Sequence, residues 1–368
     1  MDLIDDPVLN TFAAGTMLLS LATGLYLIYT QFQGPILRYV PRRPVPWGAF
    51  ATVVAVLYLF SSIAAAMLQS TPEKSEKPEE KTVAASPVDP GAKVDSTELA
   101  EQLLGGMAPI VLVVAGFAFI VAIMSHASPR DLGWPSSWYE LAIDARTGFV
   151  AALAALLPVH LIQGVLSAAM GIKDSGHELV KLVREGESSV MVMVLAGISA
   201  VVVAPICEEV AFRLLLQGWL EKWEDRKLGW RAGPTPVVSS EGGSVASDVL
   251  RLQLVNGELL STDADAVGEV AATVAAEPAN IPPPPEYPPE RGLAGLPHGW
   301  LPIIISSVMF GVAHLGYGPE PVPLFFLALF LGYLYQRTHR IVPSIVCHAC
   351  FNAFTVFVLW RIVFHGAR

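Results

Sequence analysis

Six polar residues lie inside three strongly apolar stretches of the chain, and their types are those of catalytic groups. They are Glu208, Glu209 and Arg213 in 204-APICEEVAFRLLLQGWL-220, His314 in 310-FGVAH-314, and His348 and Asn352 in 347-CHACFN-352. An ionisable side chain inside a membrane span costs about 2.5–3.5 kcal/mol on insertion scales, so each is a candidate functional group. Because these groups cannot all face lipid, we expect them to converge in the interior of a helical bundle.

Helical spacing separates the two glutamates. Glu209 and Arg213 share a helix face at i,i+4, in the favourable order of an acid before a base. Glu208 points about 100° away from Glu209 around the helix, so it cannot make the same contact. We therefore expect Glu209 to pair with Arg213. Glu208 would then face a cavity or another partner, where a carboxylate suits general-base catalysis.

The same residues allow two hydrolytic chemistries. A glutamate and a histidine can deprotonate a water molecule, and the two donors His348 and Asn352, also at i,i+4, can point at one oxyanion. Alternatively, Glu208 or Glu209 with His314 and His348 has the ligand count of a catalytic zinc site. The spacing leaves both readings open, because the groups come from three separate helices.

The composition is typical of a membrane protein. Of the 368 residues, 53% are hydrophobic and only 15% are charged, whereas an average soluble domain is about 25% charged. The net charge of −10 and the lack of a basic stripe argue against a nucleic-acid partner. The three cysteines, Cys207, Cys347 and Cys350, lie in apolar segments and are expected to be small buried side chains.

The hydrophobic pattern predicts an all-α integral membrane protein of about eight transmembrane helices, with a buried polar active-site cavity in the C-terminal half. The expected spans are 8–29, 47–68, 103–124, 147–170, 190–219, 300–315, 323–335 and 341–364. Lys and Arg concentrate in alternate short loops, which places those loops in the cytoplasm and both termini outside. Glu208 lies about three helical turns from the basic end of its span, which indicates an active site open toward the cytoplasm.

The pattern also divides the chain into five parts. These are two N-terminal transmembrane helices (1–70), a disordered extracytoplasmic loop (71–102), transmembrane helices with the first motif (103–222), a cytoplasmic Pro/Gly-rich insertion (223–299), and C-terminal transmembrane helices with the other two motifs (300–368). The first loop is too rich in Pro, Glu, Lys and Ser to bury a core. The insertion contains a possible hairpin around Asn256-Gly257 and a proline run that is typical of a semi-rigid spacer.

The order E-E-x-x-x-R, F-x-x-x-H, H-x-x-x-N, with each motif on its own apolar helix, resembles the CAAX protease and bacteriocin-processing family of intramembrane endopeptidases. The resemblance covers roughly 191–222 and 301–358, and it is strongest in 309-MFGVAHL-315 and 332-GYLYQRTHRIVPSIVCHACFN-352. Two features depart from the family: Leu214 stands where relatives usually have glycine, and the 223–299 insertion is long.

The resemblance implies a role for each residue and favours a metal-free mechanism without a cofactor, with zinc as the alternative. Glu208 with His314 would hold and deprotonate the attacking water, Glu209 and Arg213 would form a mainly structural pair in which Glu209 can assist, and His348 and Asn352 would donate to the oxyanion. The expected activity is hydrolysis of a peptide bond in a peptide or membrane-anchored protein substrate. The enzyme would lie in the lipid bilayer, in the plasma or inner membrane if the protein is bacterial.

Two other classes of function remain as alternatives. Buried Glu, Arg and His residues also form the proton relays of coupled transporters. The first four spans contain no counterpart of the motifs, which argues against the inverted repeat typical of that class. A non-catalytic membrane scaffold or immunity protein could retain the same cluster for folding.

Overall fold

The structure is a computed structural model of the whole chain, and it describes residues 6–43, 45–54, 57, 115–116, 119, 121–171, 190–230, 288–315 and 319–366. These residues belong to a helical unit formed by Met1–Trp230 and Pro289–Arg368, with Pro288 the one described residue of the second unit, Arg231–Pro288. Most of the expected spans 47–68 and 103–124, the 71–102 loop and the Asn256-Gly257 hairpin lie outside the described residues. The five-part division of the chain stays a prediction.

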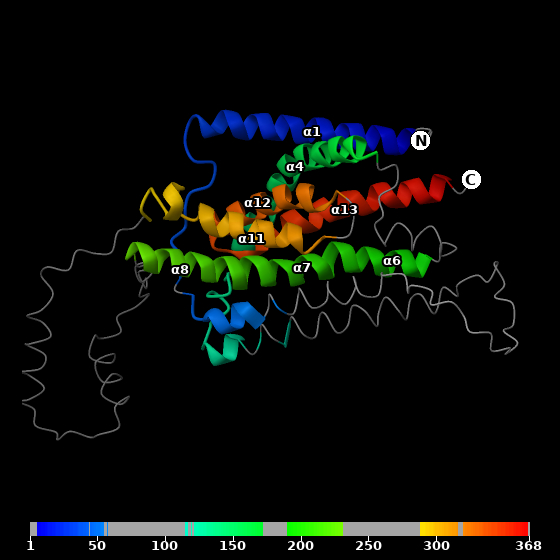
Figure 1. The fold of residues 1–368 in the computed structure, drawn as a ribbon. Helices are drawn as coiled ribbons and strands as arrows, with labels where there is room; N and C mark the ends of the chain where they lie inside the picture. Colours follow the sequence, from blue (N-terminus) through cyan, green and yellow to red (C-terminus); the bar gives the residue numbers. More distant parts are fainter. Residues whose placement is uncertain are drawn as a thin grey trace, which may run out of the picture. The chain divides into compact units, whose positions relative to one another are not determined.

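The described residues form helices joined by irregular segments and contain no β-strand, which confirms the all-α prediction for this part of the chain. The elements are α1 (Pro7–Gln31), α4 (Trp138–Ala169), α6 (Val190–Ile198), η1 (Ser199–Val203), α7 (Ala204–Glu209), η2 (Val210–Gln217), α8 (Gly218–Leu228), η3 (Leu293–Gly295), α11 (Trp300–Val312), α12 (Pro321–Thr338) and α13 (Ile341–Gly366). Their order along the chain is shown by colour in Figure 1.

Within these ranges, four helices are long and apolar enough to cross a membrane: Pro7–Gln31, Trp138–Ala169, Val190–Leu228 and Ile341–Arg361. They correspond to the first, fourth, fifth and eighth expected spans and agree with an integral membrane protein. The sixth expected span is the shorter apolar helix α11, with 13 residues. The seventh corresponds to α12, with 18 residues. The total of eight spans stays a prediction.

The first motif lies in one continuous helix, Val190–Leu228, whose middle is not regular α-helix (Figure 1). Two π-helical segments, η1 and η2, flank α7, which contains both glutamates. At the end of η1 the amide of Ala204 donates to the carbonyl of Ser199, a bond from residue i to i−5. π-Helical turns inside α-helices are often found at functional sites.

Pro205 leaves one backbone carbonyl of this π-helical region, that of Ala200, without its helical donor. In the π-helical pattern the carbonyl of Ala200 would accept from residue 205, but proline has no N–H to donate. The side-chain amide of Asn352, on α13, donates to this carbonyl instead, at 2.8 Å. The proline thus leaves an acceptor in one helix that a motif residue of another helix satisfies.

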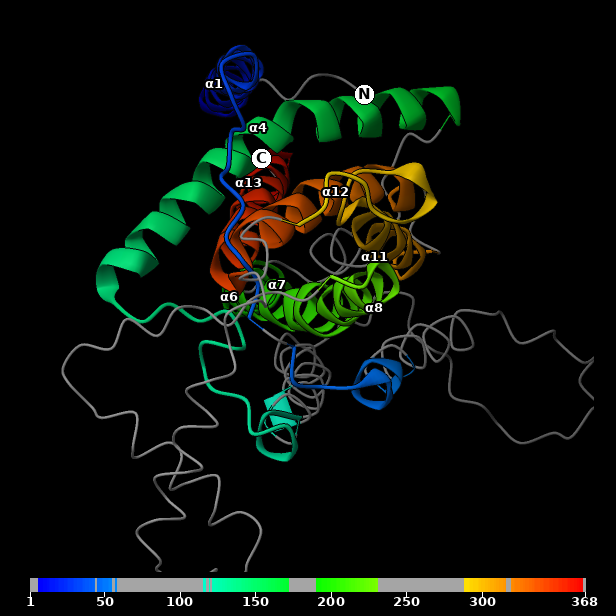
Figure 2. The same cartoon turned by 90° about the vertical axis from the view of Figure 1, so that its left-hand side faces the viewer.

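The core is formed where α4, α12 and α13 meet. Their apolar side chains form one buried cluster that includes Ala155, Leu331 and Cys347, and α1, α12 and α13 all pack against α4 (Figure 2). Gly148 allows the close approach of α4 to α13, because a Cβ atom at this position would lie 2.8 Å from the Cβ of Val346. Small residues at such crossings are typical of helix packing in membranes.

Candidate active site

The pair Glu209–Arg213 is fully buried, with 0% of either side chain exposed. Nε of Arg213 donates to Oε2 of Glu209 at 3.1 Å. This confirms the ion pair predicted from the i,i+4 spacing, and it accounts for one of the two acids. A buried pair of this kind is weak evidence for net stability, but removing one partner leaves an uncompensated charge.

His348 joins the two glutamates of the first motif. Its Nδ1 lies 3.0 Å from Oε1 of Glu209, at hydrogen-bond distance. Its Nε2 lies 3.8 Å from Oε2 of Glu208. Since a carboxylate can only accept, Nδ1 is the donor toward Glu209 and Nε2 is directed toward Glu208. The helix α13 therefore places its histidine between the acids of α7.

Glu208 is the more accessible acid, with 23% of its side chain exposed. Its Oε2 atom is nevertheless buried and has no hydrogen-bond partner. Buried polar atoms are nearly always paired with protein or with ordered water. Oε2 of Glu208 faces the imidazole of His348 without a hydrogen bond, and the exposed part of the side chain is what solvent can reach.

His314 lies just after α11, in the turn that follows Val312. Its Nδ1 donates to the carbonyl of Phe310 at 2.8 Å, which leaves Nε2 as the acceptor of the neutral ring. The centre of the Phe310 ring lies 4.9 Å from that of His314 and 5.7 Å from that of His348. His314 and Glu208 are both among the described residues, and no ion pair within 4.0 Å joins them. Their predicted cooperation stays a proposal.

Asn352 lies one turn beyond His348 on α13, and its amide is partly occupied by the bond to Ala200. A carboxamide nitrogen carries two hydrogens, so one donor remains for a substrate. The structure thus brings Glu208, Glu209, Arg213 and His348 into contact, with Asn352 one turn along α13 and His314 against the shared Phe310 ring. An enclosed cavity at this position stays a prediction.

Sequence reasoning missed two residues that hold this cluster, Ser306 and Gln217. Nη1 of Arg213 donates to Oγ of Ser306 at 2.8 Å, and Ser306 in turn donates to Oε1 of Gln217 at 3.3 Å. The missed signal is a repeat of polar residues at every fourth position of an apolar helix: Glu209, Arg213, Gln217, Glu221 and Asp225. Ser306 gave no signal, because a lone serine in an apolar helix is common in membranes.

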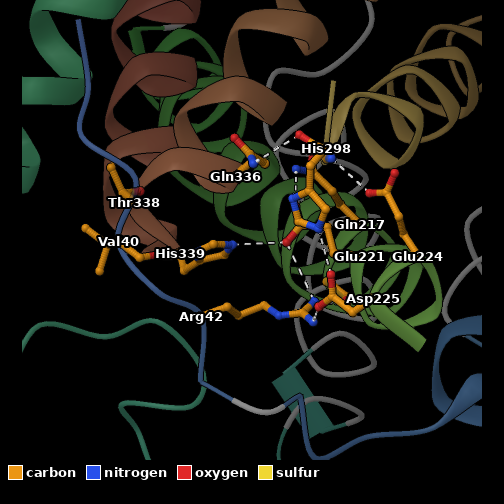
Figure 3. Close-up of polar contacts among 12 residues, drawn as sticks. Val40, Arg42, Gln217, Glu221, Glu224, Asp225, His298, Gln336, Thr338 and His339 are labelled. Carbon is orange, nitrogen blue, oxygen red and sulfur yellow. Dashed lines mark hydrogen bonds and ion pairs between the residues drawn. The ribbon is translucent and has the colours of Figure 1, made fainter. Parts of the chain in front are cut away.

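The far end of this polar row belongs to a second buried cluster, shown in Figure 3. Arg42 pairs with Asp225 and lies 3.7 Å from Glu221. His339 lies 3.1 Å from Glu221, and His298 lies 2.8 Å from Asp225. Glu221 also accepts from Gln217 at 3.0 Å, so one continuous series of contacts links this cluster with the motif residues.

The metal-free prediction and its zinc alternative both stay predictions, and the side chains show the following about a zinc site. No group of three or more His, Cys, Asp and Glu side chains lies close enough to hold a metal ion in the part of the chain that the structure describes. Glu209, one of the two candidate carboxylate ligands, is already bound by Arg213 and His348. We therefore derive no step through a metal.

Apolar helices that bury paired acids, an arginine and a histidine in mutual contact indicate an integral membrane protein with a candidate functional site in its interior. Residues 290–354 match the family model of the Type II CAAX prenyl endopeptidase Rce1-like proteins. This match confirms the family resemblance over the segment that contains His314, His348 and Asn352, and it suggests a CAAX-protease-type intramembrane endopeptidase. Glu208, Glu209 and Arg213 lie outside the matched segment. No curated protein and no solved structure matches the chain.

Proposed function

We propose that this protein is an intramembrane endopeptidase that hydrolyses a peptide bond of a membrane-associated substrate. The main support is the contact of His348 with Glu208 and Glu209. That contact joins the matched segment 290–354 to the first motif, which lies far away in the sequence. Glu208 is the acid that Arg213 does not hydrogen-bond, and 23% of its side chain is exposed, as a general base that must meet water requires.

In the proposed reaction a water molecule attacks the carbonyl carbon of the scissile bond, and Glu208 accepts its proton. The tetrahedral intermediate collapses as the C–N bond breaks, and Glu208 returns the proton to the leaving amine. His314, whose Nε2 is available as an acceptor, holds the second hydrogen of the water, as the family resemblance implies. Glu209 stays paired with Arg213 and orients His348.

His348 and Asn352 stabilise the oxyanion of the intermediate in this proposal. When protonated, His348 has an N–H on each nitrogen: Nδ1 remains bonded to Glu209, and Nε2 can donate to the substrate. Asn352 supplies the second donor from the hydrogen that Ala200 does not use.

The substrate class follows from the position of the cluster. Because the motif residues lie in apolar helices, the scissile bond must reach them from within or beside the bilayer, as in a membrane-anchored protein or peptide. We propose that the site opens toward the cytoplasm of a multi-pass protein, since the basic loop residues follow the first motif.

A comparison of membrane proteomes tests the proposed function. Cells that produce the wild-type protein and cells that produce the Glu208→Gln variant are compared for an uncut precursor. The precursor should accumulate only with the variant, and the purified wild-type protein should cleave it. If no membrane protein differs in length between the two samples, the proposal is wrong.

Replacing Asn352 by Ala is expected to lower kcat by about 10²–10³-fold, the usual cost of losing one oxyanion donor. A moderate loss of thermal stability should accompany it, because the carbonyl of Ala200 also loses its partner. The matched control is Thr355→Ala, one turn along α13, where the hydroxyl bonds only its own helix and His160. Equal kcat values for the two variants would remove Asn352 from the mechanism.

Chelation decides between the metal-free reaction and the zinc alternative. We expect purified protein to keep its activity after treatment with a strong chelator and dialysis, because Glu208 and His314 need no metal to activate water. Metal content and cleavage rate are measured before and after treatment. Loss of activity that only added Zn²⁺ restores would establish the alternative.

A further inference from the structure

We propose that Ser306 and Gln217 are positioning residues of the candidate site: they fix the guanidinium of Arg213 and, through it, Glu209 and His348. Neither residue belongs to the three motifs, and neither has a role in the proposed reaction. The inference rests on the proposed function for its kinetic consequence. Its structural consequence, the orientation of His348, can be measured independently of any activity.

The contacts of Arg213 are few, which makes each of them important. Its side chain is fully buried, and among the described side chains it hydrogen-bonds only Glu209, through Nε, and Ser306, through Nη1. Its Nη2 has no hydrogen-bond partner. The centre of the Phe310 ring lies 5.4 Å from the guanidinium carbon of Arg213. This contact does not fix how the guanidinium is rotated within its own plane. Ser306 is thus the second point that fixes the plane of the guanidinium.

Gln217 sets the direction of the hydrogen bonds in the series that runs from Gln217 through Ser306 to Arg213. Nε2 of Gln217 donates to the carbonyl of Gly332 at 2.9 Å and to Glu221 at 3.0 Å, and both partners can only accept. The amide therefore cannot flip, and its Oε1 must face Ser306. The Ser306 hydroxyl has two acceptors in reach, Gln217 at 3.3 Å and the more distant carbonyl of Ile303 at 3.5 Å. Donation to the nearer Gln217 presents the hydroxyl oxygen to Arg213.

The close packing around Gln217 supports this fixed orientation. Its side chain is fully buried, and a Cβ atom at Gly332 would lie only 3.0 Å from its Oε1. Glu221 is itself held by His339 and Arg42, as Figure 3 shows. The series therefore begins at a buried ionic cluster and ends at His348. Each member is held by hydrogen bonds from both sides, which locks a functional geometry.

The chain offers a matched pair of variants for the test. Ser306 and Ser307 are neighbours on α11, and both are 0% exposed. Ser306 contacts Arg213, whereas Oγ of Ser307 has no hydrogen-bond partner. Ser306→Ala and Ser307→Ala thus remove the same hydroxyl from equally buried places, and only the first interrupts the series. Gln217→Met interrupts the series at a second point with little change in side-chain volume.

Ser306→Ala and Gln217→Met are expected to lower kcat roughly 10- to 100-fold, since displacement of a catalytic group by about 1 Å can cost that much. KM should stay within about twofold, because neither residue would touch the substrate. Ser307→Ala should match the wild type in both. If Ser306→Ala and Gln217→Met keep the wild-type kcat, or if Ser307→Ala loses as much as Ser306→Ala, the positioning role is refuted.

Histidine labelled with ¹⁵N gives the readout that does not depend on catalysis. The ring signals of His348, assigned by their loss in His348→Gln, should shift in Ser306→Ala and Gln217→Met and stay unchanged in Ser307→Ala. If the wild-type protein cleaves nothing but these shifts occur, the proposed function fails and the positioning role stands. If cleavage occurs and the His348 signals do not move in either variant, the positioning role fails and the proposed function stands.

Discussion

Replacing Glu208 by Gln is expected to lower kcat by about 10²–10⁴-fold, the usual contribution of a general base, while the protein still folds and inserts. The exchange keeps the size of the side chain and removes only its ability to accept a proton. The fold should tolerate it, because Oε2 of Glu208 bonds no protein group and 23% of the side chain is exposed. Cleavage of a membrane substrate by purified protein measures the loss, and thermal melting checks the fold.

Glu209→Gln is the matched comparison for this prediction. This variant also replaces one of the two adjacent glutamates by a neutral side chain. It weakens the bonds to Arg213 and His348, so the melting temperature of the variant should fall. We therefore expect Glu208→Gln to separate activity from stability and Glu209→Gln to lower both. A Glu208→Gln variant that cleaves at the wild-type rate would overturn the assignment of the base.

Replacing Arg213 by Ala is expected to destabilise the protein by about 3–5 kcal/mol, because it leaves the buried carboxylate of Glu209 without its cation. The free energy of unfolding in detergent or bicelles measures this cost. Glu209 would keep its hydrogen bond to His348 but would lose the only arginine that contacts it among the described residues. Activity should fall with the folded fraction and also per folded molecule.

The control for Arg213 is Arg43→Ala. Arg43 also pairs with an acid, Asp131 at 3.3 Å, but 38% of its side chain is exposed. Exposed ion pairs contribute about 0–1 kcal/mol, so this variant should melt close to the wild type. An Arg213→Ala protein that is as stable as Arg43→Ala would show that the buried pair does not support the fold.

Local spacing predicted what lies on one helix and little of what lies between helices. The pairing of Glu209 with Arg213 follows from the i,i+4 geometry, and the structure confirms it. The contact of His348 with both acids could not be derived from spacing, because it depends on how α13 packs against α7. The sequence pattern also predicted a regular helix through the first motif. The structure has the π-helical segments η1 and η2 there.

The apolar runs predicted the existence of the long apolar helices correctly, but they predicted the helix ends less accurately. Helix α4 begins at Trp138, nine residues before the expected start at 147, because Ser137 caps it and accepts from the amide of Glu140. Hydropathy does not register such caps, since they consist of polar residues outside the apolar run. The buried cluster of Arg42, Glu221 and Asp225 was missed for the opposite reason: charged residues at a helix end look like a solvated loop.

The bond between Asn352 and the carbonyl of Ala200 has a consequence for anyone who transplants or redesigns this site. Because Pro205 has no N–H to donate, the carbonyl of Ala200 accepts from Asn352 instead. A proline just before the first motif thus helps to hold the side chain of an asparagine in the third. A grafted scaffold with an ordinary residue at position 205 would close its own backbone bond and release the amide of Asn352. The residue to copy together with the proposed catalytic side chains is therefore a proline, which has no functional group of its own.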